Sequence, residues 1–499
     1  MAATYDHALP EDDRHAGEIQ AGLLPAWKVR DLPAPPPYNL RNVLAVVGPG
    51  TILLGVSIGS GEWLLGPAVA TTYGPTLLWI VTVSVALQLA LNMGMLRYTV
   101  LTGEPIWTGY MRTKPGPAFW GWVYTVMGAL QIALPGWAAT SATATAALVL
   151  GRMPAEGDVG TVLIFGYMTF ALVLLMLAVG RKIERTLEII ETVMVVAIFG
   201  YLLFVDIFLV SGETWGKVIP GFFAFGAMPA GVDWLTLGAF AAYAGAGGCI
   251  NGFLTNWYRD KGFGMGSTIG FISGAVGGVK VSLKPTGNIP EPNEKNLATL
   301  KAWYKYIRWD QYLIWGCGAI LGMAMTVVLT VHFVPFGTKL SGLAIAAYQA
   351  EGMARMAGAI FWPLTLLISA WLLFKTQLGN SEGYVRMITD IAWTSSSRVR
   401  GWSGGDVRRI YYAILVVFAL WGAVALQMSA PFLLIVLGAN MAGLMFVFMG
   451  AHTVVVNRML PKAFRVPVWH EALLMLTTLF FLFFVVMIFL NRFFGVTFG

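Results

Sequence analysis

The sequence predicts an all-α integral membrane protein with about eleven transmembrane helices. Of its 499 residues, 57% are hydrophobic and only 11% are charged, whereas about 25% are charged in an average globular domain. A soluble fold cannot bury so much apolar surface, but lipid covers it. The 58 glycines and 19 tryptophans agree with this class, because glycine is frequent in membrane helices and tryptophan is enriched at membrane interfaces.

Apolar segments long enough to cross the bilayer recur along the chain, since a spanning helix needs roughly 20 apolar residues. The first five helices are predicted at 43–72, 75–100, 118–150, 159–180 and 187–211. The other six are predicted at 233–258, 310–334, 354–378, 410–428, 431–455 and 469–490. Residues 1–41 hold no long apolar run, so we expect a disordered cytoplasmic tail rather than a signal peptide.

Basic residues predict the orientation of these helices. With the N-terminus in the cytoplasm and the C-terminus outside, 26 of the 32 Lys and Arg residues fall in cytoplasmic segments and 5 in external ones. This asymmetry follows the positive-inside rule and predicts a plasma (cytoplasmic) membrane protein. It also accounts for the formal charge of +7 without a nucleic-acid partner.

Two connecting segments are long enough to fold on their own. The cytoplasmic loop 259–309 is expected to form a folded cap or hairpin. The external segment 338–353 is expected to form a short amphipathic helix on the membrane surface. Both cysteines, Cys249 and Cys317, lie in apolar stretches, which argues against a disulfide framework and against a zinc site.

Two of the predicted helices contain glycine clusters in the middle of their apolar runs. The first helix holds Gly48-Pro49-Gly50 and then Gly59-Ser60-Gly61-Glu62, and the sixth holds Gly245-Ala246-Gly247-Gly248. Glycine costs about 1 kcal/mol in a helix interior, so these clusters predict that both helices unwind within the membrane. Unwound backbone is tolerated there only where it lines a cavity or is buried in protein.

The two clusters occupy corresponding places, because each lies in the first helix of a set of five. The sequence thus predicts transmembrane repeats over 42–211 and 233–456 and an added helix at 469–490. Paired broken helices in two halves of a chain indicate a transport site. Close helix packing on small residues is the alternative explanation, but it requires neither the pairing nor the polar neighbours.

Several short motifs occur in a fixed order along the chain. They are Gly48-Pro49-Gly50, Gly245-Ala246, 379–383, 427–431, Asn457-Arg458-Met459 and 461–467. In these motifs and in their spacing, the chain resembles the Nramp family of divalent-metal transporters. The resemblance implies the LeuT-like fold of the amino-acid/polyamine/organocation superfamily, an inverted 5+5 repeat in which helices 1 and 6 are broken. It also implies alternating access, in which helices 1, 2, 6 and 7 rock against helices 3, 4, 8 and 9.

The positions that bind metal in that family carry other residues here. The family motif Asp-Pro-Gly-Asn falls on 59–62, so Gly59 replaces the aspartate and Glu62 the asparagine. The family motif Met-Pro-His falls on Cys249-Ile250-Asn251, and a second histidine position holds Asn256. The third helix carries no Asp or Glu between 118 and 150. The resemblance therefore implies the fold and the transporter class, and leaves the substrate open.

Glu62 is the foremost candidate for a functional side chain. A carboxylate within a membrane span costs at least ~2.5 kcal/mol, so it is usually there for a function. Glu62 also begins the second half of the broken helix, where the helix dipole favours a negative charge. We expect it to bind a cation or to carry a proton. The alternative is a cap that only satisfies the broken backbone.

The neighbours of Glu62 are expected to complete a cation site. Hard cations such as Mg²⁺ and Mn²⁺ accept carboxylate, amide and carbonyl oxygens. The candidate substrate-binding residues are Gly59, Ser60, Gly61, Glu62, Gly245, Gly247, Gly248, Cys249 and Asn251. Of these, Glu62, Asn251 and Cys249 are the candidate metal ligands, although a free cysteine also serves as a small buried hydrophobe. A single carboxylate suits a hydrated divalent ion better than a dehydrated one.

An amino-acid-like or other small organic solute is the alternative substrate. Gly59-Ser60-Gly61 is similar to the glycine-rich segment by which amino-acid permeases hold a substrate carboxylate, and exposed N–H groups at a helix start bind anions. Glu62 would then pair with a substrate amine or accept a proton. Gly247 and Gly248 would leave room opposite for a ligand larger than an ion.

Coupling to H⁺ or Na⁺ is expected to involve Glu62, Asn256, Lys375 and Glu382. Lys375 has three interpretations. It snorkels to the cytoplasm, it occupies a sodium-like site, or it pairs with Glu382. Three uncharged polar residues in the spans are expected to join helices by hydrogen bonds: Gln88, Asn92 and Gln131.

These observations together favour a secondary transporter. A membrane enzyme needs a clustered catalytic set, and the sequence offers none, so neither enzyme activity nor a cofactor is expected. The expected cargo is a small cation, with a divalent metal such as Mg²⁺ or Mn²⁺ ahead of an organic solute. The expected partners are this cargo and the lipid bilayer.

Overall fold

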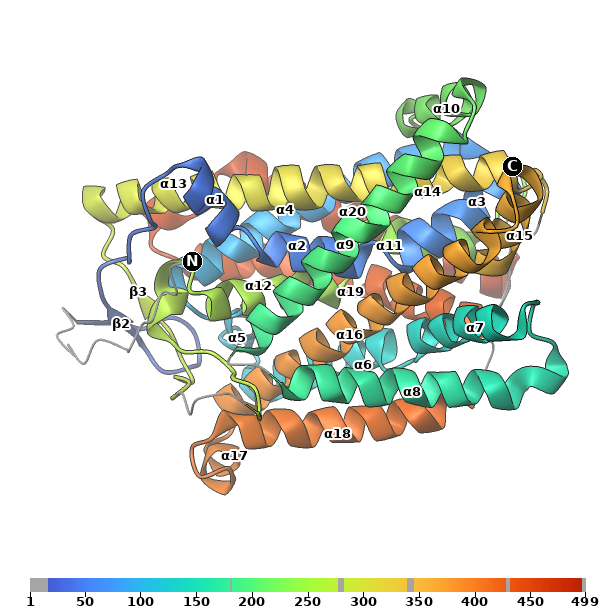
Figure 1. Ribbon diagram of the computed structural model, residues 1–499. Helices are drawn as coiled ribbons and strands as arrows, with labels where there is room; N and C mark the ends of the chain where they lie inside the picture. Colours follow the sequence, from blue (N-terminus) through green and yellow to red (C-terminus); the bar gives the residue numbers. More distant parts are fainter. Residues whose placement is uncertain (1–16, 180–181, 277–281, 339–344, 428–430, 496–499) are drawn as a thin grey trace.

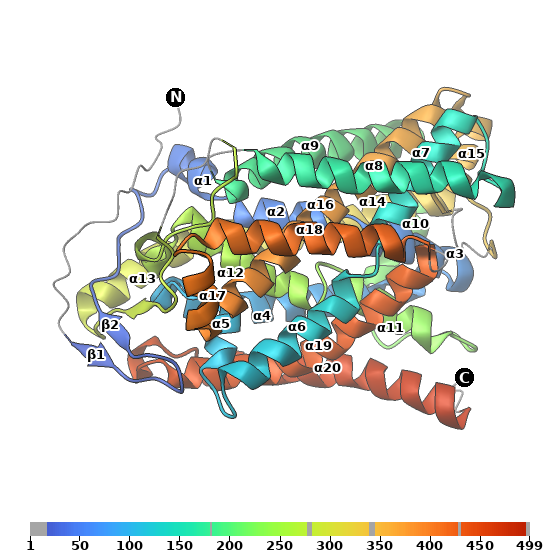
Figure 2. The same ribbon diagram turned by 90° about the horizontal axis from the view of Figure 1, so that it is seen from below.

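The protein is a bundle of long helices that run in roughly one direction, as two views of the ribbon show (Figure 1, Figure 2). The computed structural model describes residues 17–495 apart from 180–181, 277–281, 339–344 and 428–430. Within these residues, 10 helical segments are long and apolar enough to cross a membrane. Two shorter helices, α11 and α12, occupy the place of the predicted sixth helix.

The first half of the bundle follows the predicted order. Its first span is divided into α2 (Pro49–Ser57), the π-helical segment η1 (Ser60–Leu65) and α3 (Gly66–Tyr73). The four spans after it are η2 with α4 (Pro75–Leu78 and Trp79–Thr102), α6 with α7 (Pro117–Ile132 and Gly136–Leu150), α8 (Val159–Ala178) and α9 (Ile183–Phe208).

The second half begins with the other broken helix. It consists of α11 (Trp234–Tyr243) and α12 (Cys249–Lys261). The spans after it are η6 with α14 (Trp309–Cys317 and Gly318–Phe333), α16 (Phe361–Ser395), α18 (Val407–Ala425), α19 (Pro431–Met459) and α20 (Val468–Phe494).

Short elements cover the two ends of the bundle. The short helices are α1 (Leu40–Val46), α5 (Ile106–Met111), η3 (Glu156–Asp158), α10 (Gly212–Val218), η4 (Ile219–Phe223), η5 (Gly264–Thr268), α13 (Glu294–Arg308), α15 (Ile345–Ala357), α17 (Ser397–Trp402) and η8 (Lys462–Phe464). The strands β1 (Glu18–Ile19), β2 (Trp27–Val29) and β3 (Asn288–Ile289) form one sheet, in which β2 lies between an antiparallel β1 and a parallel β3.

The two ends of the bundle carry different elements. The small sheet and α13 lie at one end, and α10 and α15 lie at the other (Figure 1). The chain enters the bundle at the sheet end and leaves α20 at the α10 end. Because it starts and finishes at opposite ends, the chain passes along the bundle an odd number of times. Along the sides, α8, α18 and α20 expose large apolar side chains such as Leu175, Leu420 and Phe489. Such a surface is stable in contact with lipid.

Two predicted helices differ from the observed ones. The third span is interrupted between α6 and α7 around Pro135, which cannot donate a backbone hydrogen bond. The eighth, predicted at 354–378, runs from Phe361 to Ser395 as α16. Its second half carries polar residues that resemble a loop in sequence, but these side chains are buried against other helices.

The prediction of a disordered tail over 1–41 is wrong for residues 17–41. Trp27 on β2 is fully buried and donates a hydrogen bond to the Glu104 carboxylate (3.1 Å). The backbone N–H of Leu32 donates to Asn296 on α13 (3.0 Å), and Trp303 donates to the carbonyl of Pro33 (2.7 Å). The segment folds because loop 259–309 and the turn between α4 and α5 supply these partners. Residues 1–16 lie outside the described residues.

The described parts of loop 259–309, which leave out 277–281, form a folded cap, one of the two forms that the sequence predicts. It contains the end of α12, η5, β3 and α13, and the N-terminal strand β2 pairs with β3. The predicted surface helix at 338–353 corresponds to α15 (Ile345–Ala357), while residues 339–344 lie outside the described part.

Candidate functional site

The first span unwinds at the predicted glycines. The α-helix α2 ends at Ser57, Gly59 takes a non-helical conformation, and η1 resumes at Ser60. A Cβ added at Gly61 would overlap the carbonyl oxygen of Tyr243, at the end of α11. Glycine is therefore required at this position, because the two broken helices touch backbone to backbone there.

The sixth span unwinds between α11 and α12. Gly245, Gly247 and Gly248 have φ values of 109°, 104° and 53°, a region that residues with a Cβ rarely adopt. A Cβ at Gly247 would overlap the ring of Tyr243, and one at Gly248 would lie 2.5 Å from Gln131 Oε1. The predicted room for a larger ligand at these two glycines is thus filled by protein in this conformation.

Two glutamines hold the break of the sixth helix. Gln88 Oε1 accepts hydrogen bonds from the N–H groups of Ala246 (3.0 Å) and Gly247 (3.3 Å), and its Nε2 donates to the carbonyl of Ala244 (2.8 Å). Gln131 Oε1 accepts from the N–H of Cys249 (3.0 Å), and its Nε2 donates to the carbonyl of Gly247 (2.9 Å). The prediction that these residues join helices is confirmed, and their partner is the unwound backbone.

Glu62 lies where the two breaks meet. Its side chain is fully buried in η1, and its Oε1 accepts a hydrogen bond from the N–H of Gly245 (3.3 Å). Its Oε2 has no hydrogen-bond partner within the described residues. The backbone carbonyl of Glu62 accepts from Thr326 Oγ1 on α14 (2.6 Å). Glu62 therefore joins the two broken helices with one oxygen and leaves the other available to a ligand.

Asn251 and Cys249 lie on the first turn of α12, beyond the break. Asn251 Oδ1 accepts from the N–H of Gly247 (3.0 Å), and its Nδ2 donates to Asn92 Oδ1 (2.9 Å). As a metal ligand, Asn251 would compete with these two contacts. Cys249 is a fully buried free cysteine. Among the described residues, no group of three His, Cys, Asp or Glu side chains is arranged to hold a metal ion.

Lys375 caps the end of α2. It is fully buried on α16, and its Nζ donates to the carbonyl oxygens of Ile58 (2.9 Å) and Gly55. The C-terminal end of a helix is negatively polarised and attracts a cation. Of the three interpretations, the sodium-like site matches this geometry. Snorkelling and pairing with Glu382 do not, because the ammonium points into the break of the first span.

Glu382 and Asn256 belong to a separate network between α12 and α16. Glu382 accepts from Trp257 Nε1 (2.8 Å) and pairs with Arg386, which also pairs with Asp260. Asn256 donates to Asp390. Glu382 follows Lys375 by seven residues, about 10 Å along the helix axis. Glu382 and Asn256 therefore fasten α12 to α16 at the α13 end of the bundle.

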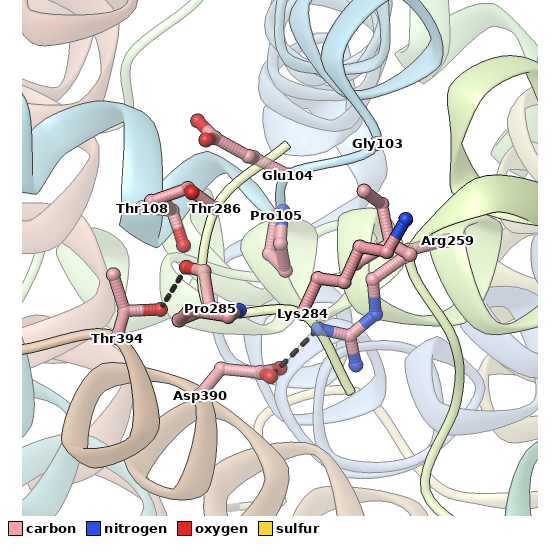
Figure 3. Close-up of a pocket in the computed structure, with 11 residues that line it drawn as sticks. Gly103, Glu104, Pro105, Thr108, Arg259, Lys284, Pro285, Thr286, Asp390 and Thr394 are labelled. Carbon is pink, nitrogen blue, oxygen red and sulfur yellow. Dashed lines mark hydrogen bonds and ion pairs between the residues drawn. The ribbon is translucent and has the colours of Figure 1, made fainter. Parts of the chain in front are cut away.

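A small pocket opens beside this network (Figure 3). Arg259 Nη1 contacts Asp390 Oδ1 (2.6 Å), and Thr394 Oγ1 donates to the carbonyl of Pro285 (3.0 Å). The pocket is lined by residues of α12, α16, the α4–α5 turn and the segment before β3. The pocket lies where the cap meets the bundle, away from Glu62.

Two of the buried acids in the spans that were not singled out from the sequence are Asp310 and Glu191. Asp310 accepts from the N–H groups of Gly48 (3.0 Å) and Gly50 (2.7 Å) and so caps the start of α2. Glu191 on α9 is fully buried, and neither carboxylate oxygen has a hydrogen-bond partner within the described residues. The available signal was a carboxylate inside an apolar run. Both acids stand near the predicted ends of helices, where an acid is unremarkable.

Comparison with known proteins identifies the fold. The sequence matches no protein-family model and no curated protein. Three solved structures of the manganese transporter of Eremococcus coleocola, two of them mutants, do match. In the order histidine-to-alanine mutant, glutamate-to-glutamine mutant and complex with an aromatic bis-isothiourea substituted compound, their TM-scores are 0.61, 0.60 and 0.59. Their sequence identities to this chain are 12%, 13% and 12%, and the matches cover 93%, 93% and 92% of this chain. The match spans 91%, 91% and 89% of those chains. Over most of its length, this chain therefore shares the fold of a manganese transporter, as its resemblance to the Nramp family implies.

Proposed function

We propose that the protein is a secondary transporter whose substrate site lies between the two broken helices. The observation that carries the proposal is Glu62, a buried carboxylate where the break at Gly59 meets the break at Gly245, with one oxygen that no described residue hydrogen-bonds. Broken helices in corresponding positions of two halves place polar backbone at the centre of a membrane protein, where transporters bind cargo. The cargo would reach Glu62 by alternating access.

We favour a small cation as the cargo, and a divalent metal such as Mg²⁺ or Mn²⁺ above others. A carboxylate oxygen and the carbonyls of unwound backbone are hard ligands of the kind these ions prefer. The three solved structures reported above, which share this fold, are of a manganese transporter. Because Glu62 is the one acid in the two unwound segments that the structure describes there, 58–65 and 244–248, the ion would be held partly through its own water molecules.

An amino-acid-like or other small organic solute is the second candidate. Glycines at 59 and 61 and Ser60 leave the first break without a bulky side chain, and such a segment offers N–H groups to a carboxylate. Against this candidate, Gly247 and Gly248 face filled space rather than a cavity. Their backbone would need to move before a larger solute fits.

The charge of Lys375 gives the proposed cycle a fixed cation. In transporters with broken helices, a coupling ion is held by the C-terminal end of a half-helix. Here the ammonium of Lys375 donates hydrogen bonds to the carbonyls of Ile58 and Gly55, at the C-terminal end of α2. We therefore propose that coupling to sodium at this place is replaced by a charge that belongs to the protein.

Uptake into proteoliposomes tests the proposal. Mg²⁺, Mn²⁺, a panel of amino acids and a panel of organic cations are offered to the wild type, to Glu62→Gln and to Glu213→Gln. Glu213 is an exposed acid on α10 and serves as the matched control. We expect flux of a divalent ion that is lost in Glu62→Gln and kept in Glu213→Gln. Flux of an organic solute instead would support the second candidate, and no flux of any kind would contradict a transporter.

A further inference from the structure

Glu191 is a buried acid that the substrate site leaves unused. It lies within α9, is fully buried, and has no hydrogen-bond partner for either oxygen within the described residues. A Cβ added at Gly55 on α2 would overlap Glu191 Oε2, and one at Gly379 on α16 would lie 3.3 Å from Oε1. The carboxyl group is therefore wedged between α2 and α16, against a glycine of each helix.

Lys375 lies beside this carboxyl group. It precedes Gly379 by one turn of α16, and its ammonium donates to the carbonyl of Gly55, the same residue against which Glu191 packs. The ammonium lies within electrostatic range of the carboxyl groups of both Glu191 and Glu62. No ion pair joins Lys375 to Glu191 among the described residues; the ammonium is satisfied by the end of α2 instead.

This arrangement favours a neutral Glu191 in the present conformation. A buried carboxylate without a donor is strongly disfavoured, whereas a protonated carboxyl group carries no net charge. The ammonium of Lys375 does not supply that donor: among the described residues it donates to the carbonyls of Gly55 and Ile58 and makes no hydrogen bond to Glu191. The acceptors of Lys375 thus depend on where α2 lies.

We propose that Glu191 is the proton-binding site that couples transport to the position of α2. While α2 is seated on α16, Lys375 donates to the α2 carbonyls and Glu191 holds a proton. When α2 moves away, the ammonium loses these acceptors and pairs with Glu191. The O–H bond of the Glu191 carboxyl group then breaks, its proton passes to water, and the carboxylate keeps the electron pair; Lys375 stays protonated throughout.

The other charged groups around α9 have their own partners or lie elsewhere. On α9 itself, Glu188 lies about one turn from Glu191 and pairs with Lys261 of α12 (2.6 Å) and with Arg185 (2.6 Å). Glu184 is also buried, about two turns from Glu191, and interacts electrostatically with Lys261 and Glu188. Asp206 lies 15 residues further on, about 22 Å along the helix. Of the remaining elements packed on α9, α2 carries no charged residue, α8 contributes only Tyr167 as a titratable group, and α14 only His332, near its end. Lys375 is the charged group that faces Glu191 from α16.

The inference rests on the proposed transport cycle and is tested by following protons and cargo together. Proteoliposomes that contain a pH-sensitive dye are given Mn²⁺ or Mg²⁺, and metal uptake and internal pH are recorded with and without an acid exterior. Glu191→Gln keeps the shape of the side chain but neither gains nor loses a proton. Asp206→Asn is the matched control, since Asp206 is also a buried acid of α9 without a hydrogen-bond partner for its side chain in the described residues.

We expect wild type and Asp206→Asn to show uptake that rises with an acid exterior and acidifies the interior. In Glu191→Gln we expect both effects to fall at least tenfold, while exchange of labelled for unlabelled metal continues. Lys375→Met provides a second variant, and combining it with Glu191→Gln should cause no further loss. Proton movement retained in Glu191→Gln would overturn this inference alone. Absence of metal uptake in the wild type would instead contradict the metal cargo of the proposed function.

Discussion

The carboxylate of Glu62 accepts a hydrogen bond from the backbone N–H of Gly245 (3.3 Å), and this contact joins the breaks of the first and sixth spans. The two residues are 183 positions apart in the chain. Their contact means that the polar centre of each half of the protein lies against the other. A change at one break is therefore expected to be felt at the other.

Gly61→Ala should separate the two breaks. The added Cβ would overlap the carbonyl of Tyr243, and overpacking of this kind costs about 1–3 kcal/mol. We expect a lower apparent Tm in detergent and loss of transport. Gly200→Ala on α9 is the control, because nothing lies within 4 Å of its Cβ position. That variant should be as stable as the wild type or more so, by up to about 1 kcal/mol. Equal Tm values for the two variants would contradict the close contact.

Gln88→Leu should loosen the break of the sixth helix. The change leaves the N–H of Ala246 and the carbonyl of Ala244 without their partner, while the N–H of Gly247 keeps Asn251. Each unsatisfied buried group costs about 1–3 kcal/mol, so the apparent Tm should fall clearly. Hydrogen exchange at 244–248 should become faster. Gln427→Leu removes an exposed glutamine and should change neither quantity. If Gln88→Leu behaves like Gln427→Leu, the glutamine does not hold the break.

Acid should destabilise the contact between the N-terminal segment and the bundle through Glu104. Burial alone would raise the pKa of the Glu104 carboxyl group, but the charge of Arg112 and hydrogen bonds from Arg112, Tyr98 and Gly287 outweigh it, and the pKa is lowered. Because the folded pKa lies below the unfolded value of about 4.3, this stabilisation is complete above that value. It is lost as the pH falls through the folded pKa.

The measurement is the apparent Tm of wild type and Glu104→Gln between about pH 6 and pH 3, across the ordinary range of a carboxyl group. Glu104→Gln should be less stable at pH 6, and the difference from wild type should shrink towards pH 3. Glu213→Gln alters an exposed acid that pairs with Lys217, and its difference from wild type should be small throughout. A gap between wild type and Glu104→Gln that does not depend on pH would contradict the proposed ion pair.

Sequence alone predicted the spans and the breaks, because both depend on local composition. Apolar runs of sufficient length became helices, and the glycine clusters at Gly59 and Gly245 became unwound backbone. Sequence alone did not predict the folding of residues 17–41. Trp27 is buried and donates a hydrogen bond to Glu104, a residue far along the chain that no local pattern links to it.

Polar contacts across helices were the other part that sequence did not predict. Asp310 caps Gly48 across 262 positions, and no local pattern in the sequence links the two. The role of Glu191 likewise follows from its packing against Gly55 and Gly379 on two other helices. Glu62 was found because a carboxylate in a broken helix is itself a local signal. Its hydrogen bond to Gly245 became visible only in the folded chain.

Labelling of Cys249 tests most directly whether cargo reaches the space between the breaks. The chain has two cysteines, so Cys317→Ser leaves Cys249, on the first turn of α12, as the single thiol. Alternating access predicts that Cys249 in proteoliposomes reacts slowly with a water-soluble thiol reagent, and that saturating Mn²⁺ or Mg²⁺ changes this rate several-fold. The added substitution Glu62→Gln should abolish the effect of the ion. A Cys249 that never reacts, or that reacts at one rate with or without every cargo tested, would contradict a substrate site at the two breaks.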